Sequence, residues 1–171
     1  TIIFRVKYHL SEQVSGLRFI EASGDRPLQV SSACFPNKAR EWIPCYDATN
    51  DKVTQDMIIT CSSKFKVLSN GSLINTTVHQ NGTSTWHWNQ KDPHASYLIN
   101  LSIADYLVVE DSLGNLPVNY WVYHSMADDV VRVFGKTPYM IDFYTRVYDY
   151  PFPWEKYDQV ISGYMGGGAE A

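Results

Sequence analysis

The chain has 171 residues, of which 44% are hydrophobic and 19% charged, and its formal net charge is −4. This length suits one ordinary domain with a short extension, and the composition is globular rather than disordered. The acidic balance and the lack of a basic stripe make nucleic acid a poor expected partner. Because Arg5 and Lys7 interrupt the first residues and no apolar run approaches ~20 residues, we expect no signal peptide or transmembrane segment, and the compartment stays open.

Alternating apolar and polar residues predict a series of β-strands over the first 124 residues. The first predicted strand carries Phe4, Val6, Tyr8 and Leu10 on one face. The second covers residues 53–61, again with one apolar face. Further strands are expected from residue 65 to the Asn70-Gly71 turn and at residues 74–78, 83–90, 97–103, 107–109 and 118–123.

Two Asn-Gly pairs, Asn70-Gly71 and Asn81-Gly82, separate alternating runs and predict β-hairpins, because both turn residues need a positive φ. These asparagines, with Asn75 and Asn100, also open Asn-x-Ser/Thr sequons. Sequons matter only in a secretory eukaryotic context, so we interpret the Asn-Gly pairs as turn chemistry.

The pattern changes near Ser125, after which two short helices are expected. Ser125 is placed to cap the first helix, and Gly135 to end it. Thr137-Pro138 is a helix start, with Thr as the cap and Pro at the first helical position, and Pro151 lies beyond its end. A last strand is expected within residues 158–165. The apolar faces of the two helices are long enough to need a partner.

The cysteines Cys34, Cys45 and Cys61 have no Cys-x-x-Cys spacing, so a zinc ribbon is excluded and buried free thiols are expected. A Cys34–Cys45 disulfide is compatible with the sequence but not established by it. The histidines form no His-Glu-x-x-His motif, and no nucleophile elbow is present. Trp86 and Trp88 share a strand face, where they either pack in the sheet or form a platform for a sugar ring.

Several spaced motifs resemble one known family. Between residues 35 and 60 the chain contains Ala39, Arg40, Trp42, Pro44, Cys45, Asp47, Asn50, Asp51 and Lys52 in the order of that family. Residues 150–160 read YPFPWEKYDQV and are followed by a glycine-rich end. Matches between these stretches fall at Ser69-Asn70-Gly71, Pro117-Val118, Tyr120 and Thr137-Pro138. From about Gly16 to Glu170 the chain resembles the aminopeptidase N-like zinc metallopeptidases.

The resemblance implies a mainly β fold, with an antiparallel sandwich or saddle-like N-terminal domain followed by a short α-helical and strand extension. Residues 1–124 would be part of the N-terminal β-domain. Residues 125–171 would start the catalytic domain and stop at its glycine-rich substrate-binding loop. The family's zinc-binding His-Glu-x-x-His would follow later, so zinc would belong to the parent enzyme, and we expect no metal bound by this chain.

The resemblance also implies a set of substrate-binding residues. Gly167, Gly168 and Glu170 match the family's loop, in which the acid binds the substrate's free amine. Phe35 occupies a position where the family has Glu or Gln, and an aromatic ring offers an ammonium only a cation–π contact. Ala169 and Ala171 depart from the Met and Asn of the family loop. In the same region we expect Arg40, Trp42 and Asp47 to form a folded corner.

These observations lead to one main hypothesis and two alternatives. The main hypothesis is a fragment of a zinc-dependent aminopeptidase that helps recognise the N-terminus of a peptide substrate but contains no catalytic residue. We then expect the isolated chain not to hydrolyse aminoacyl anilides. The alternatives are a stand-alone β-sandwich module that binds carbohydrate or protein, and a catalytically inactive relative. Under the main hypothesis, residues 125–171 are expected to contact either the remaining catalytic domain or a second copy of the chain.

Overall fold

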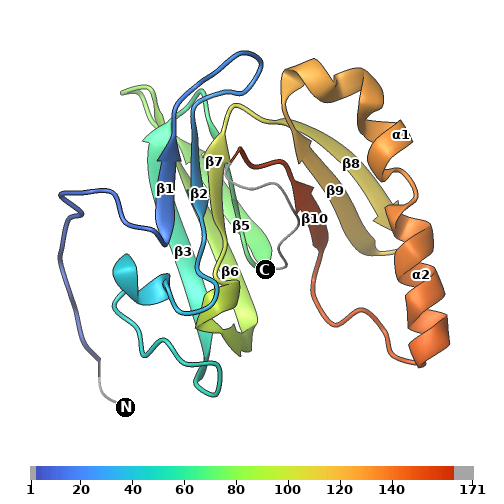
Figure 1. The fold of residues 1–171 in the computed structure, drawn as a ribbon, viewed down its shortest axis with the longest axis horizontal. Helices are drawn as coiled ribbons and strands as arrows, with labels where there is room; N and C mark the ends of the chain where they lie inside the picture. The colour runs from blue at the N-terminus through green and yellow to red at the C-terminus, as the bar shows by residue number, and fades with distance from the viewer. Residues whose placement is uncertain (1–2, 164–171) are drawn as a thin grey trace.

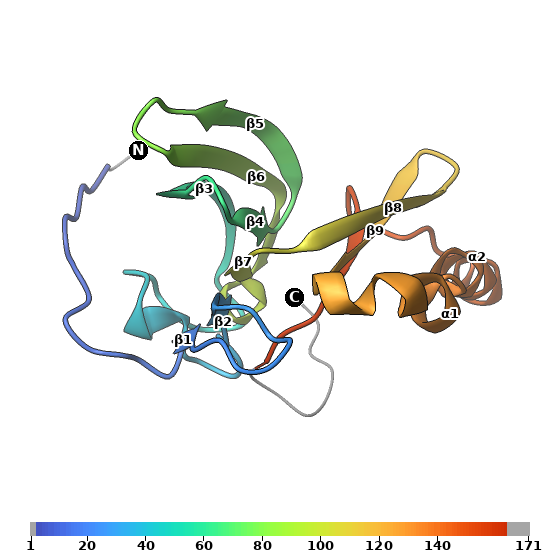
Figure 2. The same ribbon diagram turned by 90° about the horizontal axis from the view of Figure 1, so that it is seen from above.

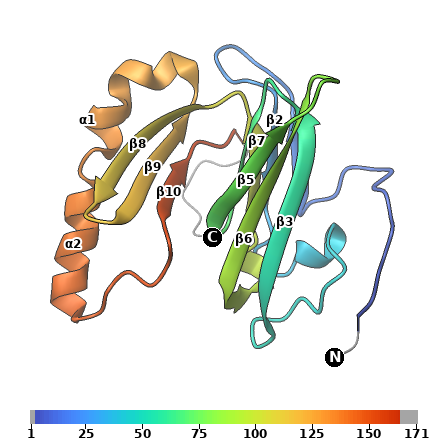
Figure 3. The same ribbon diagram turned by 180° about the vertical axis from the view of Figure 1, so that it is seen from behind.

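Two antiparallel sheets face each other in the computed structural model, which describes residues 3–163 (Figure 1). One sheet has the strand order β1-β2-β7-β4 and the other β3-β6-β5. The bounds of these strands are β1 Leu17–Ile20, β2 Gln29–Ser32, β3 Lys52–Ser62, β4 Lys66–Ser69, β5 Ser72–Val78, β6 Thr83–Ala95 and β7 Leu101–Ala104. Figure 3 shows β3, β5 and β6 as the outer sheet on the reverse side of the molecule. The prediction of a mainly β, antiparallel sandwich is confirmed.

The core of the sandwich lies between the two sheets. Val67 is fully buried, and it belongs with Leu17 and Leu101 to one apolar cluster. The predicted inner face of β3 packs against this cluster through Met57, Ile59 and Cys61. Side chains at alternate positions of β3 are exposed, as the alternation predicts for a strand with one buried face.

A third sheet stands beside the sandwich and carries the helices on its far side (Figure 2). Strands β8 (Leu107–Leu113) and β9 (Leu116–Val122) form a hairpin, and β10 (Tyr157–Val160) pairs with β9 in parallel. The junction with the sandwich is aromatic: Trp88 of β6 packs in one cluster with Tyr106, Trp121 and Tyr123.

Two helices, α1 (Val130–Phe134) and α2 (Thr137–Tyr148), cover this third sheet after a 3-10 turn, η3 (His124–Asp129). Val130 and Ile141 are buried against Val118 and Tyr120 of β9, which explains why the chain is helical here. The predicted helices are therefore confirmed, and so is Gly135 as the residue that ends α1. The two predicted N-caps are not confirmed. Ser125 lies inside η3, and Thr137 is the first residue of α2 rather than its cap.

The strand predicted over residues 4–10 is absent. Residues 3–10 have no regular structure, and their side chains are exposed. Among the described residues no strand pairs with this segment, and alternation by itself cannot hold an extended chain without a partner edge. Its contact with the body of the protein includes the hydroxyl of Tyr8, which donates to the carbonyl of Trp42 at 2.6 Å.

Asn70-Gly71 does not form the predicted hairpin. It is a corner that takes the chain from β4 in one sheet to β5 in the other. The Asn70 amide fixes this corner, because it donates to the carbonyl of Leu98 at 2.9 Å and accepts from the backbone amide of Asn100 at 2.7 Å. Gly71 has φ +73°, and a Cβ there would lie 2.0 Å from the carbonyl oxygen of Asn89. Asn70-Gly71 is therefore a turn, as predicted. Contacts with residues distant in the sequence determine which sheet the following strand joins.

Asn81-Gly82 does form the predicted hairpin, between β5 and β6, with Gly82 at φ +80°. The strand predicted at residues 97–103 is shorter than expected, because a 3-10 turn, η2 (Ser96–Leu98), precedes β7. The predicted last strand ends at Val160, and residues 164–165 lie outside the described part. Within residues 3–163, no helix is long and apolar enough to cross a membrane.

Candidate functional site

The turn after β2 leads into the region that the sequence singles out. Cys34, which follows β2, has only 3% of its surface exposed. Its sulfur accepts a hydrogen bond from the Trp42 indole N–H at 3.4 Å. Burial raises the pKa of the Cys34 thiol to about 11, so the sulfur stays protonated and unreactive. All three cysteines are free, which confirms the expectation of unpaired thiols.

Phe35 follows directly and points away from the core. Its side chain is 68% exposed, and its ring meets that of Tyr97 edge-on, with centroids 5.8 Å apart and an interplanar angle of 77°. Phe35 is therefore not a core-packing residue. One face of an exposed aromatic ring of this kind is available to a cation.

A folded corner holds the residues behind Phe35. Its 3-10 turn, η1 (Ala39–Glu41), buries Ala39 completely, and Trp42 is 7% exposed. Asp47 accepts from the backbone amide of Arg40 at 3.2 Å and from its Nε at 3.4 Å. This is the folded corner expected from the sequence, in which Arg40, Trp42 and Asp47 stabilise the fold.

The carboxylate of Asp47 is well enclosed, with 1% of its side chain exposed. Burial opposes its charge, but hydrogen bonds from the Ser96 hydroxyl and from Arg40 hold the pKa of Asp47 below its usual value. The Arg40 side chain is 54% exposed, so solvent screens its share of this ion pair.

Glu41 is an acid that lies near Phe35 in the sequence. Both of its carboxylate oxygens are already engaged: the Ser15 hydroxyl donates to them at 2.8 and 2.9 Å, and the Gly16 amide donates at 2.7 Å. The Ser15 hydroxyl, followed by the Gly16 amide, lowers the pKa of Glu41. Glu41 thus ties residues 15–16 to the corner, and its carboxylate is not free to bind a ligand.

The other predicted substrate-binding residues, Gly167, Gly168 and Glu170, lie outside the described residues. The structure does describe the chain that approaches them. After β10, the Ile161 amide continues the pairing with β9 by donating to the carbonyl of Trp121 at 2.9 Å. Ser162 and Gly163 then contact β2, where the Ser162 hydroxyl lies 3.1 Å from that of Ser31.

No group of three or more His, Cys, Asp or Glu side chains within residues 3–163 could hold a metal ion. The histidines are scattered: His87 contacts Asp56 at 2.6 Å, and His124 contacts Asp105 at 3.2 Å. Burial lowers the pKa of His94, which keeps that imidazole neutral near pH 7. The described residues therefore do not fit a zinc ion.

The structure argues against a sugar platform at Trp86 and Trp88. Trp88 is 4% exposed, its N–H donates to the carbonyl of Val67 at 3.1 Å, and its ring packs on Trp121 at 6.5 Å. Trp86 packs against the two clusters of the sandwich and its junction. A platform must present a ring face to solvent, whereas Trp88 is buried in the core and Trp86 is half-buried against it.

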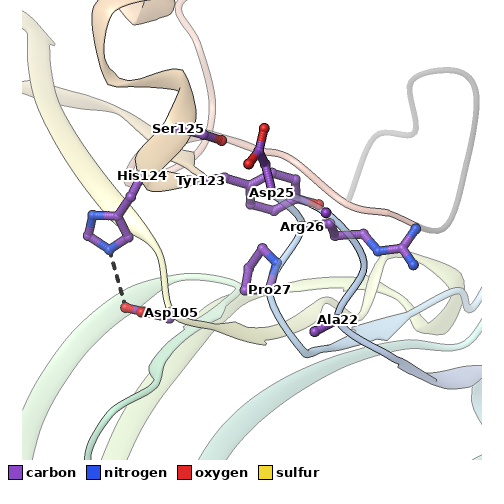
Figure 4. A pocket seen from close by; sticks show the side chains of 9 residues that line it. Ala22, Asp25, Arg26, Pro27, Asp105, Tyr123, His124 and Ser125 are labelled. Carbon is purple, nitrogen blue, oxygen red and sulfur yellow. Dashed lines mark hydrogen bonds and ion pairs between the residues drawn. The ribbon is translucent and has the colours of Figure 1, made fainter.

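Two pockets are lined by described residues other than Phe35. A pocket of about 310 Å³ lies where the β1–β2 loop meets Asp105 and residues 123–125 (Figure 4). In that view His124 pairs with Asp105, while Asp25 and Arg26 come from the β1–β2 loop. An apolar pocket of about 400 Å³ lies between α2 and residues 150–159. Phe35 does not line either pocket.

Comparisons with known proteins indicate the same family as the sequence motifs. The family described as the peptidase M1 N-terminal domain matches residues 1–98. The chain is 23% identical over 169 residues to a Drosophila melanogaster protein named transcription initiation factor TFIID subunit 2, a match covering 92% of this chain and 13% of the relative. It is 26% identical over 140 residues to aminopeptidase N of Canis lupus familiaris, covering 77% of this chain and 14% of that protein. The matched region spans about one-seventh of the length of these relatives.

Proposed function

The chain belongs to the peptidase M1 N-terminal domain family, and we propose from this premise that it is part of a larger zinc-dependent aminopeptidase, called the parent protein below. In the proposal, residues 1–124 belong to the N-terminal β-domain and residues 125–171 begin the catalytic domain. The similarity to aminopeptidase N over 77% of the chain supports this assignment.

The proposed role of the chain is to recognise the free amine at the N-terminus of a peptide substrate. The observation that carries this proposal is the exposure of Phe35, whose side chain is 68% exposed instead of buried. By the family resemblance, Phe35 matches the position of an amine ligand. Its ring offers the ammonium a cation–π face. Glu170 supplies the charge-assisted hydrogen bond, and Gly167 and Gly168 let the loop backbone approach the substrate.

Zinc belongs to the parent protein in this proposal. A zinc ion bound in the catalytic domain would activate water for attack on the peptide bond. In this proposal the chain supplies substrate recognition and no hydrolytic step.

The outer face of α2 is the proposed contact with the rest of the catalytic domain, or with a second copy. Met140 and Tyr144 are each 53% exposed, and Val147 is 57% exposed. Apolar side chains gathered on one exposed helix face mark an interface more often than a free surface.

A second candidate function is a catalytically inactive relative that acts through binding alone. Two observations favour it: Phe35, Ala169 and Ala171 replace polar or larger family residues, and one relative is named as a transcription initiation factor subunit. In that case the parent protein would keep the fold and lose recognition of the amine.

One binding experiment separates the two functions. Affinities of the zinc-loaded parent protein are measured for an α-amino acid hydroxamate and for its Nα-acetyl counterpart. Because a hydrogen bond to a charged group contributes ~1.5–3 kcal/mol, the free amine should bind about ten- to a hundredfold more tightly. The 171-residue chain alone should hydrolyse no aminoacyl anilide, with or without zinc.

Equal affinity for the two hydroxamates, with no hydrolysis by the parent protein, would reject amine recognition and favour the inactive relative. Zinc-dependent turnover by the 171-residue chain, free of contaminating peptidase, would show that the chain does more than recognise the substrate and that the proposed role is wrong.

A further inference from the structure

Strand β5 (Ser72–Val78) leaves one edge of the outer sheet uncovered. It is an end strand in the order β3-β6-β5, so no described strand pairs with its outer edge (Figure 2). All seven of its residues are exposed. Two of its β-branched apolar side chains are well exposed, Ile74 at 53% and Val78 at 74%. Such an edge presents unpaired backbone N–H and C=O groups, which are a template for pairing with another strand.

β5 differs from the other edge strands in its charge. Sheets commonly protect their edges with charged side chains. Every other strand at the edge of a described sheet carries at least one: Arg18 in β1, Lys52 and Asp56 in β3, Lys66 in β4, Glu110 and Asp111 in β8, and Asp158 in β10. β5, which reads SLINTTV, contains no charged residue and no proline. Two copies of β5 can therefore lie side by side without repulsion between like charges.

The hydrogen bonds to β6 show which backbone groups of β5 face outward. The His79 amide, directly after β5, donates to the carbonyl of Thr83 on the β6 side at 2.8 Å. Successive residues of an antiparallel strand alternate between facing one neighbour and facing the other. Thr77 therefore also faces β6, whereas Thr76 and Val78 direct their N–H and C=O groups to the open edge.

These outward groups favour one register between β5 and the β5 of a second copy. A two-fold axis at Thr77 places Thr76 opposite Val78 of the second copy, so that each such pair exchanges two backbone hydrogen bonds. Thr77 then faces its own counterpart at the close, non-hydrogen-bonded position, and Thr–Thr pairs are favourable cross-strand neighbours. The bulge between Leu73 and Asn75 lies before these residues and does not disturb the register.

We propose that β5 is a dimerisation edge, at which two copies of this chain pair antiparallel and join their outer sheets into one continuous sheet. The arrangement closes at two copies, because both ends of the joined sheet are then β3, which carries Lys52 and Asp56. The edge includes neither Phe35 nor any residue of α2. The inference is therefore independent of amine recognition, and it leaves the outer face of α2 to the remaining catalytic domain.

Charge substitution at Thr77 tests the pairing. Sedimentation equilibrium measures the dimer dissociation constant of the 171-residue chain, and far-UV circular dichroism checks that each variant folds. Thr77→Lys and Thr77→Glu each place like charges opposite one another at the two-fold axis, so each should raise the dissociation constant by about tenfold. An equal mixture of the two variants should restore dimerisation, because opposite charges then meet.

The matched control for an added charge is Val147→Lys on α2, where Val147 is 57% exposed. This variant should dimerise as the wild-type chain does. A wild-type chain that stays monomeric over a wide range of concentrations would overturn the proposal, and so would a mixture of the two Thr77 variants that does not recover. A dimer that dissociates in Val147→Lys but not in the Thr77 variants would place the interface on α2 instead.

Cysteine substitution tests the register. Thr77→Cys places two thiols across the axis at a Cα separation of about 4.5 Å, which a disulfide can bridge. Oxidised glutathione should then produce a covalent dimer, whereas Thr76→Cys, which faces Val78 of the second copy, should produce much less. The wild-type chain, whose three cysteines are free, gives the background. Equal cross-linking at positions 76 and 77 would overturn the proposed antiparallel pairing.

Discussion

Replacing Trp88 by alanine is expected to lower the free energy of unfolding by about 3–5 kcal/mol. Trp88 is 4% exposed and packs where the sandwich meets the third sheet, against Trp121. The substitution removes this packing and leaves the carbonyl of Val67 without the indole donor. Urea unfolding of the 171-residue chain, followed by far-UV circular dichroism, measures the change.

The matched control is Ile58→Ala on the neighbouring strand β3. Ile58 is 61% exposed, so its removal should change stability by no more than about 0.5 kcal/mol. If Trp88→Ala were as mild as Ile58→Ala, Trp88 would not be a core residue, and the sugar-platform alternative would return.

Phe35→Glu in the parent protein is expected to tighten binding of an α-amino acid hydroxamate by about ten- to a hundredfold. The change places a carboxylate where the family resemblance implies a Glu or Gln, and a hydrogen bond to a charged group contributes ~1.5–3 kcal/mol. Because Phe35 is 68% exposed and outside the core clusters, the fold should tolerate the charge. Isothermal titration calorimetry of both proteins gives the ratio of dissociation constants.

Tyr46→Glu is the control for a general effect of added negative charge. Tyr46 is an exposed aromatic residue in the same corner, at 72% exposure, and has no predicted contact with the substrate. Equal tightening in the two variants would show that net charge, not a specific contact, is responsible. No tightening in Phe35→Glu would place the family's amine ligand elsewhere in the sequence.

Much of the fold could be predicted because the signals are local. Alternation located β3, β6, β8 and β9, and helical spacing located α2, since one buried face controls each of these elements. The short strands β1 and β2 were missed: each has four residues, and β2 buries polar Gln29 and Ser31. Nothing in the local pattern distinguishes buried glutamine from exposed glutamine, because its partners lie more than 70 residues away.

Strand pairing could not be predicted from the local sequence. Asn70-Gly71 has the residues of a hairpin turn, yet β4 pairs with β7 and β5 with β6. The Asn70 side chain holds this corner by donating to the carbonyl of residue 98 and accepting from the amide of residue 100, and both partners lie far along the chain. The strand expected at residues 4–10 was wrong for a related reason, because alternation cannot show whether a partner edge is present.

The candidate site, like the fold, could be predicted only in part. The sequence and the family resemblance pointed to Phe35, and the structure adds that its ring is exposed and meets Tyr97. No local sequence pattern indicates the hydrogen bonds of Gln29, because its partners Tyr106, Tyr123 and Gly163 are distant in the sequence and meet only in the folded chain. Placement of Glu170 beside a substrate stays a prediction.

The central claim is that Phe35 and Glu170 meet the same substrate amine. A crystal structure of the zinc-loaded parent protein with a bound α-amino acid hydroxamate tests it most directly. We predict that the ligand's ammonium nitrogen lies within about 6 Å of the Phe35 ring centroid and within about 2.9 Å of a Glu170 carboxylate oxygen. An ammonium bound by other residues, with Phe35 out of contact, would contradict it.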